Sequence, residues 1–216
     1  MNKQVLENPA KNQDNLIIIT ALMITCYLTS NIMAVKLVEI NGHSWFDAGT
    51  VTFPLAYMLG DVLTEIWGYK TAKKVIYLTF ICNLIMTLAT YIGVLLPGAS
   101  YLSKVNNAYE VIFTYTPRIL IASLIAFLLG ELTNAKVMEL IKKATKEKYL
   151  FIRTILSSMA GYIFDTGVFV ILAFYGTCKL GDLFTMIIVQ YFIKVIIEAI
   201  LATPLAYLIV GYLKKC

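Results

Sequence analysis

Long apolar segments alternate with short polar ones along almost the whole chain. A helix needs about 20 predominantly apolar residues to cross the hydrocarbon core of a bilayer, and six segments meet this requirement. The polar segments between them are too short to hold a second domain. The pattern predicts an all-α integral membrane protein with six transmembrane helices, at residues 16–37, 50–69, 74–96, 112–134, 152–175 and 183–212.

Composition agrees with this class, since 59% of the 216 residues are hydrophobic and only 14% are charged. The first apolar segment is too long for the core of a signal peptide, and no small-residue cleavage site follows it. We therefore expect it to remain as a helix. The predicted organisation is a cytoplasmic polar tail at residues 1–15 and one six-helix transmembrane domain at residues 16–213.

Lysine and arginine are concentrated on one side of this six-helix arrangement. The positive-inside rule makes that side cytoplasmic and places both termini there. The net charge of +5 is then explained by topology and by attraction to the anionic lipid bilayer. We expect no nucleic acid as a partner.

Signatures of metal, redox or nucleotide chemistry are missing from the sequence. The four cysteines are scattered singly, there is one histidine, and no GxxxxGK[ST] phosphate loop occurs. We therefore expect no metal, no other cofactor and no intrinsic nucleotide hydrolysis.

Charged side chains inside the apolar segments carry most of the functional information. An ionised group near the middle of a membrane helix costs about 2.5–3.5 kcal/mol, so such groups persist where they face a partner, a cavity or a substrate. The second segment contains Asp61 and Glu65 one helical turn apart, and the fifth contains Asp165 near its middle. The sixth repeats Gln190, Lys194 and Glu198 on one face.

Ion pairing within the membrane explains only part of this set. Lys194 could pair with Glu198 in the same helix, or with Asp165 or Asp61 as structural glue between helices. However, Asp61, Glu65, Asp165, Lys194 and Glu198 sum to a net charge of −3 when all are ionised. Some carboxyl groups are then protonated, or a polar ligand solvates them. Two other polar residues, Glu131 and Asn134, are expected near the cytoplasmic boundary of the fourth helix.

Four short motifs occur in order along the apolar segments. They are FP-x-x-Y-x-x-x-D followed by G-Y-K in the second segment, ELTN-x-K at the end of the fourth, S-S…D-T in the fifth and Q-x-x-x-K-x-x-x-E…P in the sixth. With these motifs, the chain from Asn31 to Leu213 resembles the queuosine precursor transporter family, also called vitamin-uptake-transporter-like proteins.

The resemblance implies an importer in the cell (inner) membrane for a purine-like small molecule. Its substrates would be 7-deazaguanine compounds, namely the cyano or aminomethyl precursors or the base queuine, salvaged for tRNA modification. The implied fold is related to the substrate-binding subunits of energy-coupling-factor vitamin transporters. Asp61, Asp165 and Lys194 match the firmest polar positions of the family, whereas Glu65 and Glu198 match less uniform ones.

The chemistry of a guanine-like base fits these residues. Its N1–H and exocyclic amine suit one carboxylate, and its O6 acceptor suits a lysine or an amide donor. Asp165 and Lys194 could supply these groups, with Asn31 and Gln190 assisting. The second carboxylate that an aminomethyl ammonium requires could be Asp61. Aromatic faces for the flat ring are available in Phe53, Tyr57, Phe164 and Phe169.

Three other functions stay open at this point. A vitamin-binding subunit would need an energising partner complex, although its A-x-x-x-A docking pattern is here changed to Ala21 followed by Thr25. A membrane-embedded enzyme could use Asp61 and Asp165 as an aspartyl dyad. A structural subunit would use its polar residues only for pairing. For a carrier, a proton on Asp61 or Asp165 could be the coupling ion, with facilitated diffusion and metabolic trapping as the rival. The sequence predicts no particular oligomeric state.

Overall fold

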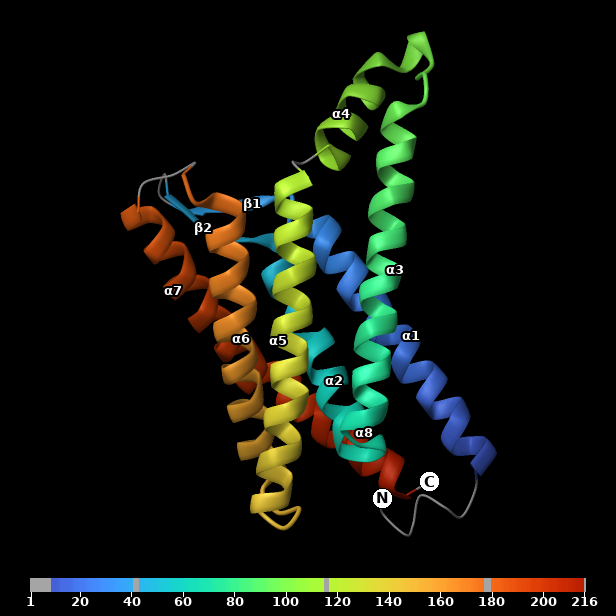
Figure 1. Ribbon diagram of the computed structural model, residues 1–216, viewed down its shortest axis with the longest axis vertical. Coiled ribbons are helices and arrows are strands. Elements are labelled where there is room, and N and C mark those ends of the chain that lie inside the picture. The colour runs from blue at the N-terminus through green and yellow to red at the C-terminus, as the bar shows by residue number, and fades with distance from the viewer. Residues whose placement is uncertain (1–8, 41–42, 115–116, 177–179, 216) are drawn as a thin grey trace.

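The computed structural model describes residues 9–40, 43–114, 117–176 and 180–215, and it is a bundle of helices with one small β-hairpin (Figure 1). The elements in chain order are α1 (Pro9–Met33), β1 (Leu37–Ile40), β2 (His43–Asp47), the 3₁₀-helix η2 (Ala48–Val51), α2 (Phe53–Trp67), α3 (Tyr69–Leu95), the 3₁₀-helix η3 (Ser100–Leu102), α4 (Ser103–Phe113), α5 (Pro117–Ala144), α6 (Leu150–Phe174), α7 (Leu180–Ile197), the π-helix η4 (Glu198–Ala202) and α8 (Thr203–Lys215).

The helices run up and down between two ends of the molecule (Figure 1). The start of α1, the α2–α3 junction, the α5–α6 turn and the end of α8 lie at one end, which we call the basic end because Lys142, Arg153 and Lys214 lie there. The antiparallel hairpin of β1 and β2 and the short helix α4 lie at the opposite end, which we call the hairpin end. The all-α membrane class is confirmed, and the hairpin is an addition that the sequence did not predict.

The second predicted span forms a shorter helix than expected. Of the 15 residues of α2, 13 are buried, and a helix of this length is about 22 Å long, against about 30 Å of hydrocarbon core. Among the described residues, five helical elements are long and apolar enough to cross a membrane, and α2 is not one of them. Gly68, with a φ of 81°, ends α2 and allows the chain to turn into α3. Thus α2 is a central helix enclosed by the others.

The fourth helix extends further than predicted, which corrects the expected position of two polar residues. It runs from Pro117 to Ala144, so Glu131 and Asn134 lie in its middle and not at its exit. Both side chains are fully buried. The sequence prediction ended the helix where these polar residues appear, but they face the protein interior, and Lys142 and Lys143 mark the true last turn.

The sixth predicted span lies within a continuous helical element from α7 through η4 to α8. One π-helical turn at Glu198–Ala202 precedes Pro204. Proline cannot donate a backbone hydrogen bond and clashes with the preceding turn, which is a common reason for an irregular turn inside a helix. The irregular turn holds Glu198 inside the bundle, where its side chain is 1% exposed.

Helices α5 and α6 pack closely through two glycines. A side-chain carbon on Gly161 would lie 2.9 Å from the backbone oxygen of Gly130 and 2.7 Å from the Tyr57 ring. Only glycine permits this approach. The contact brings α2, α5 and α6 together in the centre of the bundle, where most of the buried charged residues lie.

Candidate functional site

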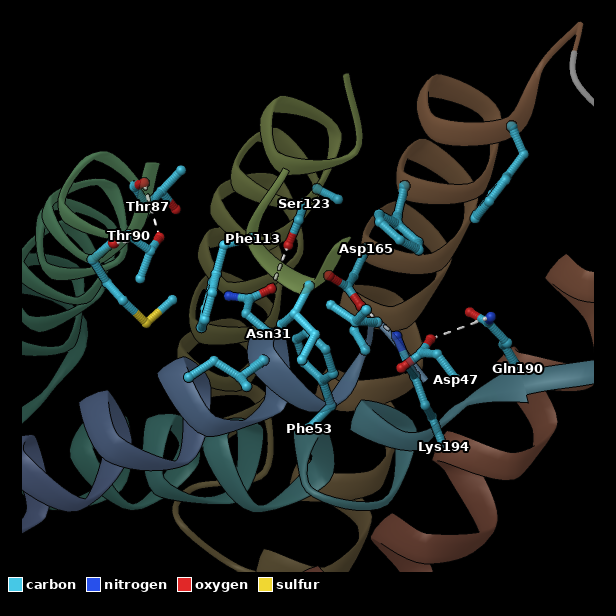
Figure 2. A pocket seen from close by; sticks show the side chains of 18 residues that line it. Asn31, Asp47, Phe53, Thr87, Thr90, Phe113, Ser123, Asp165, Gln190 and Lys194 are labelled. Carbon is cyan, nitrogen blue, oxygen red and sulfur yellow. Dashed lines mark hydrogen bonds and ion pairs between the residues drawn. The ribbon is translucent and has the colours of Figure 1, made fainter. Parts of the chain in front are cut away.

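A cavity lies between the helices in the half of the bundle nearest the hairpin end, and Figure 2 shows the side chains that line it. About 70 Å³ of it is accessible to the centre of a water molecule, whereas one buried water needs about 10–15 Å³. It therefore has room for a small organic molecule. Its polar lining comes from α1, β2, α3, α5, α6 and α7, and consists of Asn31, Asp47, Thr87, Thr90, Ser123, Asp165, Gln190 and Lys194.

A buried ion pair joins α7 to α6 at the cavity wall (Figure 2). The Lys194 ammonium lies 2.6 Å from an Asp165 carboxylate oxygen and 3.2 Å from the Thr166 hydroxyl. The ammonium also lies 4.9 Å from the centroid of the Phe53 ring, which is a favourable cation–π distance. Lys194 and Asp165 are each about 3% exposed, so either one without the other would be a buried unpaired charge, which is strongly destabilising.

A second carboxylate, Asp47, reaches the cavity from the end of the hairpin. One of its oxygens accepts a hydrogen bond of 3.1 Å from the Thr50 amide and so caps η2. The other accepts a longer bond of 3.4 Å from the Gln190 amide, as Figure 2 shows. Burial raises the pKa of the Asp47 carboxyl above its usual value, while the Lys194 charge and the Thr50 amide oppose this rise.

An amide and hydroxyl network forms the opposite wall of the cavity. Asn31 on α1 donates to Asn83 on α3 at 3.1 Å and accepts from Ser123 on α5 at 2.7 Å. These bonds fix the orientation of the Asn31 amide between three helices. The cavity thus combines two carboxylates, one ammonium and oriented amides, a set that can recognise several donors and acceptors on one ligand.

The structure brings together five of the ten residues predicted to bind substrate. The cavity is lined by Asp165, Lys194, Asn31, Gln190 and Phe53, and also by the aromatic Phe169.

The other five predicted residues do not line the cavity. Phe164 lies on the bundle surface with 47% of its side chain exposed, while Tyr57, Asp61, Glu65 and Glu198 are buried nearer the basic end. The suggested Lys194–Glu198 pair is wrong, because Lys194 pairs with Asp165 and Glu198 accepts a 2.9 Å hydrogen bond from Tyr162. The two carboxylates of the suggested aspartyl dyad also have separate partners, since Asp61 accepts from Asn134 at 3.0 Å.

Asp61, Glu131 and Glu198 form a group that we call the acidic layer. All three are at most 1% exposed. In the described part of the chain, four of their six carboxylate oxygens have no hydrogen-bond partner, namely Asp61 Oδ2, both Glu131 oxygens and Glu198 Oε1. The Glu131 carboxylate lies against the backbone of Gly60, the residue before Asp61. A side-chain carbon added to Gly60 would lie only 2.8 Å from a Glu131 carboxylate oxygen.

Glu65 closes the basic end of the bundle through ion pairs with three helices, and we call this group the Glu65 clamp. Its carboxylate oxygens lie 2.8 Å from Arg153 on α6, 2.9 Å from Lys214 on α8 and 3.4 Å from Lys142 on α5. Arg153 is 1% exposed. The prediction that Glu65 contacts substrate therefore receives no support from its position.

Helix α2 connects these three levels. Phe53, Tyr57, Asp61 and Glu65 follow one another every four residues and thus share one face. They span about 18 Å along the helix axis. Phe53 belongs to the cavity, Asp61 to the acidic layer and Glu65 to the clamp, with Tyr57 between the first two.

Sequence reasoning missed Asp47 and Ser123 as lining residues. Asp47 was assigned to an extramembrane linker, although aspartate three residues before Thr50 is a helix-capping signal that could have indicated an ordered position. Ser123 is a small polar residue in an apolar helix, which is common in membrane bundles and carries little information on its own.

Comparisons with known proteins agree with this architecture. Residues 47–209 match a family model described as "Putative vitamin uptake transporter". A Bacillus subtilis protein named "Probable queuosine precursor transporter" is 31% identical over 82% of this chain and 77% of its own length. A Haemophilus influenzae protein of the same name is 28% identical over 72% of this chain and 65% of its own length. No solved structure matches the chain significantly. The chain belongs to the vitamin uptake transporter family, and is therefore a multi-pass membrane transporter and not an enzyme.

Proposed function

We propose that this transporter imports 7-deazaguanine precursors of queuosine, the cyano or aminomethyl base or queuine, for use in tRNA modification. The observation that carries the proposal is the cavity near the hairpin end, in which Asp47, Asp165, Lys194 and Gln190 meet. The names of the two relatives support the same substrate class. We also propose an inner-membrane location with both termini cytoplasmic, on the basis of the basic end.

The lining can satisfy the hydrogen-bonding edge of a guanine-like base. The N1–H and exocyclic amine of the base can donate to one carboxylate, and its O6 can accept from Lys194 or from the Gln190 amide. Phe53 and Phe169 line the same cavity and provide apolar surfaces for the flat ring. A base lacking these groups would leave buried polar atoms unpaired, which gives selectivity.

The charge of the cavity also suits the aminomethyl precursor. Among the described lining residues, two carboxylates face one ammonium, so one negative charge is left when all are ionised. The sequence suggests Asp61 as this second carboxylate. The structure favours Asp47 for that role, because Asp47 lines the cavity and Asp61 does not.

Energy coupling is part of the proposal. We propose a proton as the coupling ion, because the membrane interior holds more carboxylates than basic side chains can neutralise. Equal accumulation of substrate with and without a proton-motive force would contradict symport. That result would favour facilitated diffusion followed by trapping of the base in tRNA.

The direct test is rescue of queuosine in the tRNA of cells that can neither make nor import the precursors. The cells would express the parent chain, Asp165→Asn or the surface control Glu139→Gln, with each precursor supplied in turn. We expect rescue by the parent and the control but not by Asp165→Asn. Failure with every precursor, despite confirmed membrane insertion, would favour a vitamin-binding subunit that needs an energising partner.

A further inference from the structure

We propose that the acidic layer of Asp61, Glu131 and Glu198 is the proton-binding site of the transporter, separate from the substrate cavity, with Glu131 as its main proton carrier. This inference rests on the proposed proton-coupled function and assigns the proton to a group other than the cavity residue Asp165.

In the part of the chain that the structure describes, no lysine or arginine forms an ion pair with the acidic layer. Lys194 is engaged by Asp165, and Arg153, Lys142 and Lys214 are engaged by Glu65. An unpaired buried ion costs several kcal/mol, and three neighbouring carboxylates would add mutual repulsion. The described titratable groups that interact electrostatically with Glu131 come from several elements: Tyr27 on α1, Tyr57 and Asp61 on α2, Asp165 on α6 with its ion-pair partner Lys194 on α7, and Glu198 in η4.

Hydrogen bonding at the layer also favours bound protons. The four carboxylate oxygens that lack a partner among the described residues are acceptors when the groups are ionised. Protonation of a carboxyl group removes its charge and turns one oxygen into an O–H donor. This O–H can donate a hydrogen bond to a neighbouring carboxylate oxygen. Glu131 is the strongest candidate, because neither of its oxygens has a partner, whereas Asp61 and Glu198 each accept one or more bonds through one oxygen.

Tyr57 lies next to both the cavity and the layer. Its ring packs against Tyr162 in a tilted arrangement at a centroid distance of 4.5 Å, and its hydroxyl lies against Gly130, the residue before Glu131. A side-chain carbon added to Gly130 would also lie 2.7 Å from the Asp165 Cβ. The Tyr57 hydroxyl is fully buried and unpartnered among the described residues. It is therefore placed to respond to a proton that leaves Glu131 and to a ligand that binds beside Asp165.

The test uses the full chain in liposomes and compares the parent with Glu131→Gln. Glutamine has the shape of a protonated glutamate but cannot release a proton. Glu139→Gln, on the same helix but paired with Lys136 and Lys143 at the surface, is the matched control. Each protein would be assayed in sodium-free buffer for exchange of labelled cyano and aminomethyl bases at equal pH, and for accumulation driven by a pH difference at clamped membrane potential.

We expect all three proteins to exchange both bases at equal pH. With a pH difference of about 1 unit and one proton per substrate, the parent and Glu139→Gln should concentrate the bases by up to about tenfold. Glu131→Gln should equilibrate them without concentrating them, and its exchange should lose the pH dependence of the parent. Pumping by Glu131→Gln equal to that of the parent would overturn the inference.

Other outcomes separate this inference from the proposed function. Absence of exchange of any deazaguanine by the parent would refute the substrate assignment. Loss of transport of the aminomethyl base alone in Glu131→Gln would show that the layer binds the substrate ammonium, and would overturn the proton role. If Glu131→Gln does not fold, infrared spectroscopy of the parent tests whether a carboxyl group of the protein is protonated. A protonated carboxylic acid band at neutral pH is expected, and its absence would contradict the inference.

Discussion

The two halves of the bundle use buried charges in opposite ways. Near the hairpin end, Asp47, Asp165 and Lys194 surround a cavity and leave room for a ligand. At the basic end, Glu65 alone binds three cations from three helices and closes the interior. The same helices α5 and α6 contribute to both halves. The arrangement of the charges thus differs between the two levels: three charged groups surround a cavity at one, and four meet in ion pairs at the other.

This contrast is what a carrier needs when it exposes its site to one side at a time. We interpret the structure as a state in which the basic end is closed. The acidic layer lies between the two halves and is the level at which a change of charge would affect both.

The first experiment removes one member of the buried pair in the cavity. Asp165→Ala leaves the buried Lys194 ammonium without its ion-pair partner, and such a change costs about 3–5 kcal/mol. We expect uptake of precursor to fall at least a hundredfold in a whole-cell assay. The double variant with the two charges exchanged should also be inactive, because the positions of donor and acceptor toward the base are reversed. Restored uptake in the exchanged variant would indicate a purely structural pair.

The second experiment opens the Glu65 clamp. Glu65→Gln leaves Arg153 without its buried carboxylate, so we expect a loss of about 3–5 kcal/mol in the stability of the closed state. The readout is labelling of Met138→Cys, a fully buried position on α5, in a background without the four native cysteines. Labelling by an impermeant maleimide from the basic end should rise in Glu65→Gln. Unchanged labelling would mean that the clamp does not seal this end.

The third experiment tests the seam where α2, α5 and α6 meet. Gly130→Ala forces a methyl group against the Tyr57 hydroxyl and the Asp165 Cβ, and overpacking of this kind costs about 1–3 kcal/mol. Gly167→Ala on α6 is the matched control, because a methyl group there has no atom within 4 Å. We expect a lower melting temperature for the first variant and an equal or higher one for the second. Equal melting temperatures would argue against tight packing at the seam.

The fourth experiment compares Phe53 and Phe164, two aromatic residues that the sequence suggests equally as faces for the flat ring of the base. Phe53→Ala removes a cavity wall and a cation–π partner of Lys194, and loss of stacking on a base costs about 1–3 kcal/mol. Phe164→Ala removes a surface side chain. The apparent KM for the base should rise for Phe53→Ala and stay within about twofold for Phe164→Ala. The reverse order would place the base outside the cavity.

Much of this arrangement could be predicted from helical periodicity. The four-residue spacing of Asp61 and Glu65, and of Gln190, Lys194 and Glu198, correctly placed each set inside the membrane domain. Periodicity gives the face of a helix but not the partner across from it. The sequence left Glu198, Asp165 and Asp61 open as partners of Lys194, and the structure selects Asp165. The pairing of Glu65 with Arg153 was not predicted, because it depends on how the helices pack.

Element ends were the least predictable feature, for physical reasons. The buried polar residues Glu131 and Asn134 in the middle of α5 look like the end of a span. Polar residues occur both at the membrane surface and in the interior of a transporter, and the sequence does not distinguish the two positions. The short buried helix α2 looks like a full span because both are apolar. Asp47 was missed because its role depends on the hairpin that turns it back into the bundle.

Equilibrium binding of the labelled aminomethyl base to purified protein tests directly whether the substrate site and the acidic layer are separate. The comparison is between Asp47→Asn in the cavity and Asp61→Asn in the acidic layer, with the parent as reference. We predict that Asp47→Asn weakens binding at least about tenfold, which equals about 1.4 kcal/mol. Asp61→Asn should bind as tightly as the parent, since asparagine resembles a protonated aspartate. Equal or greater loss of affinity in Asp61→Asn would contradict the separation of the substrate cavity from the acidic layer.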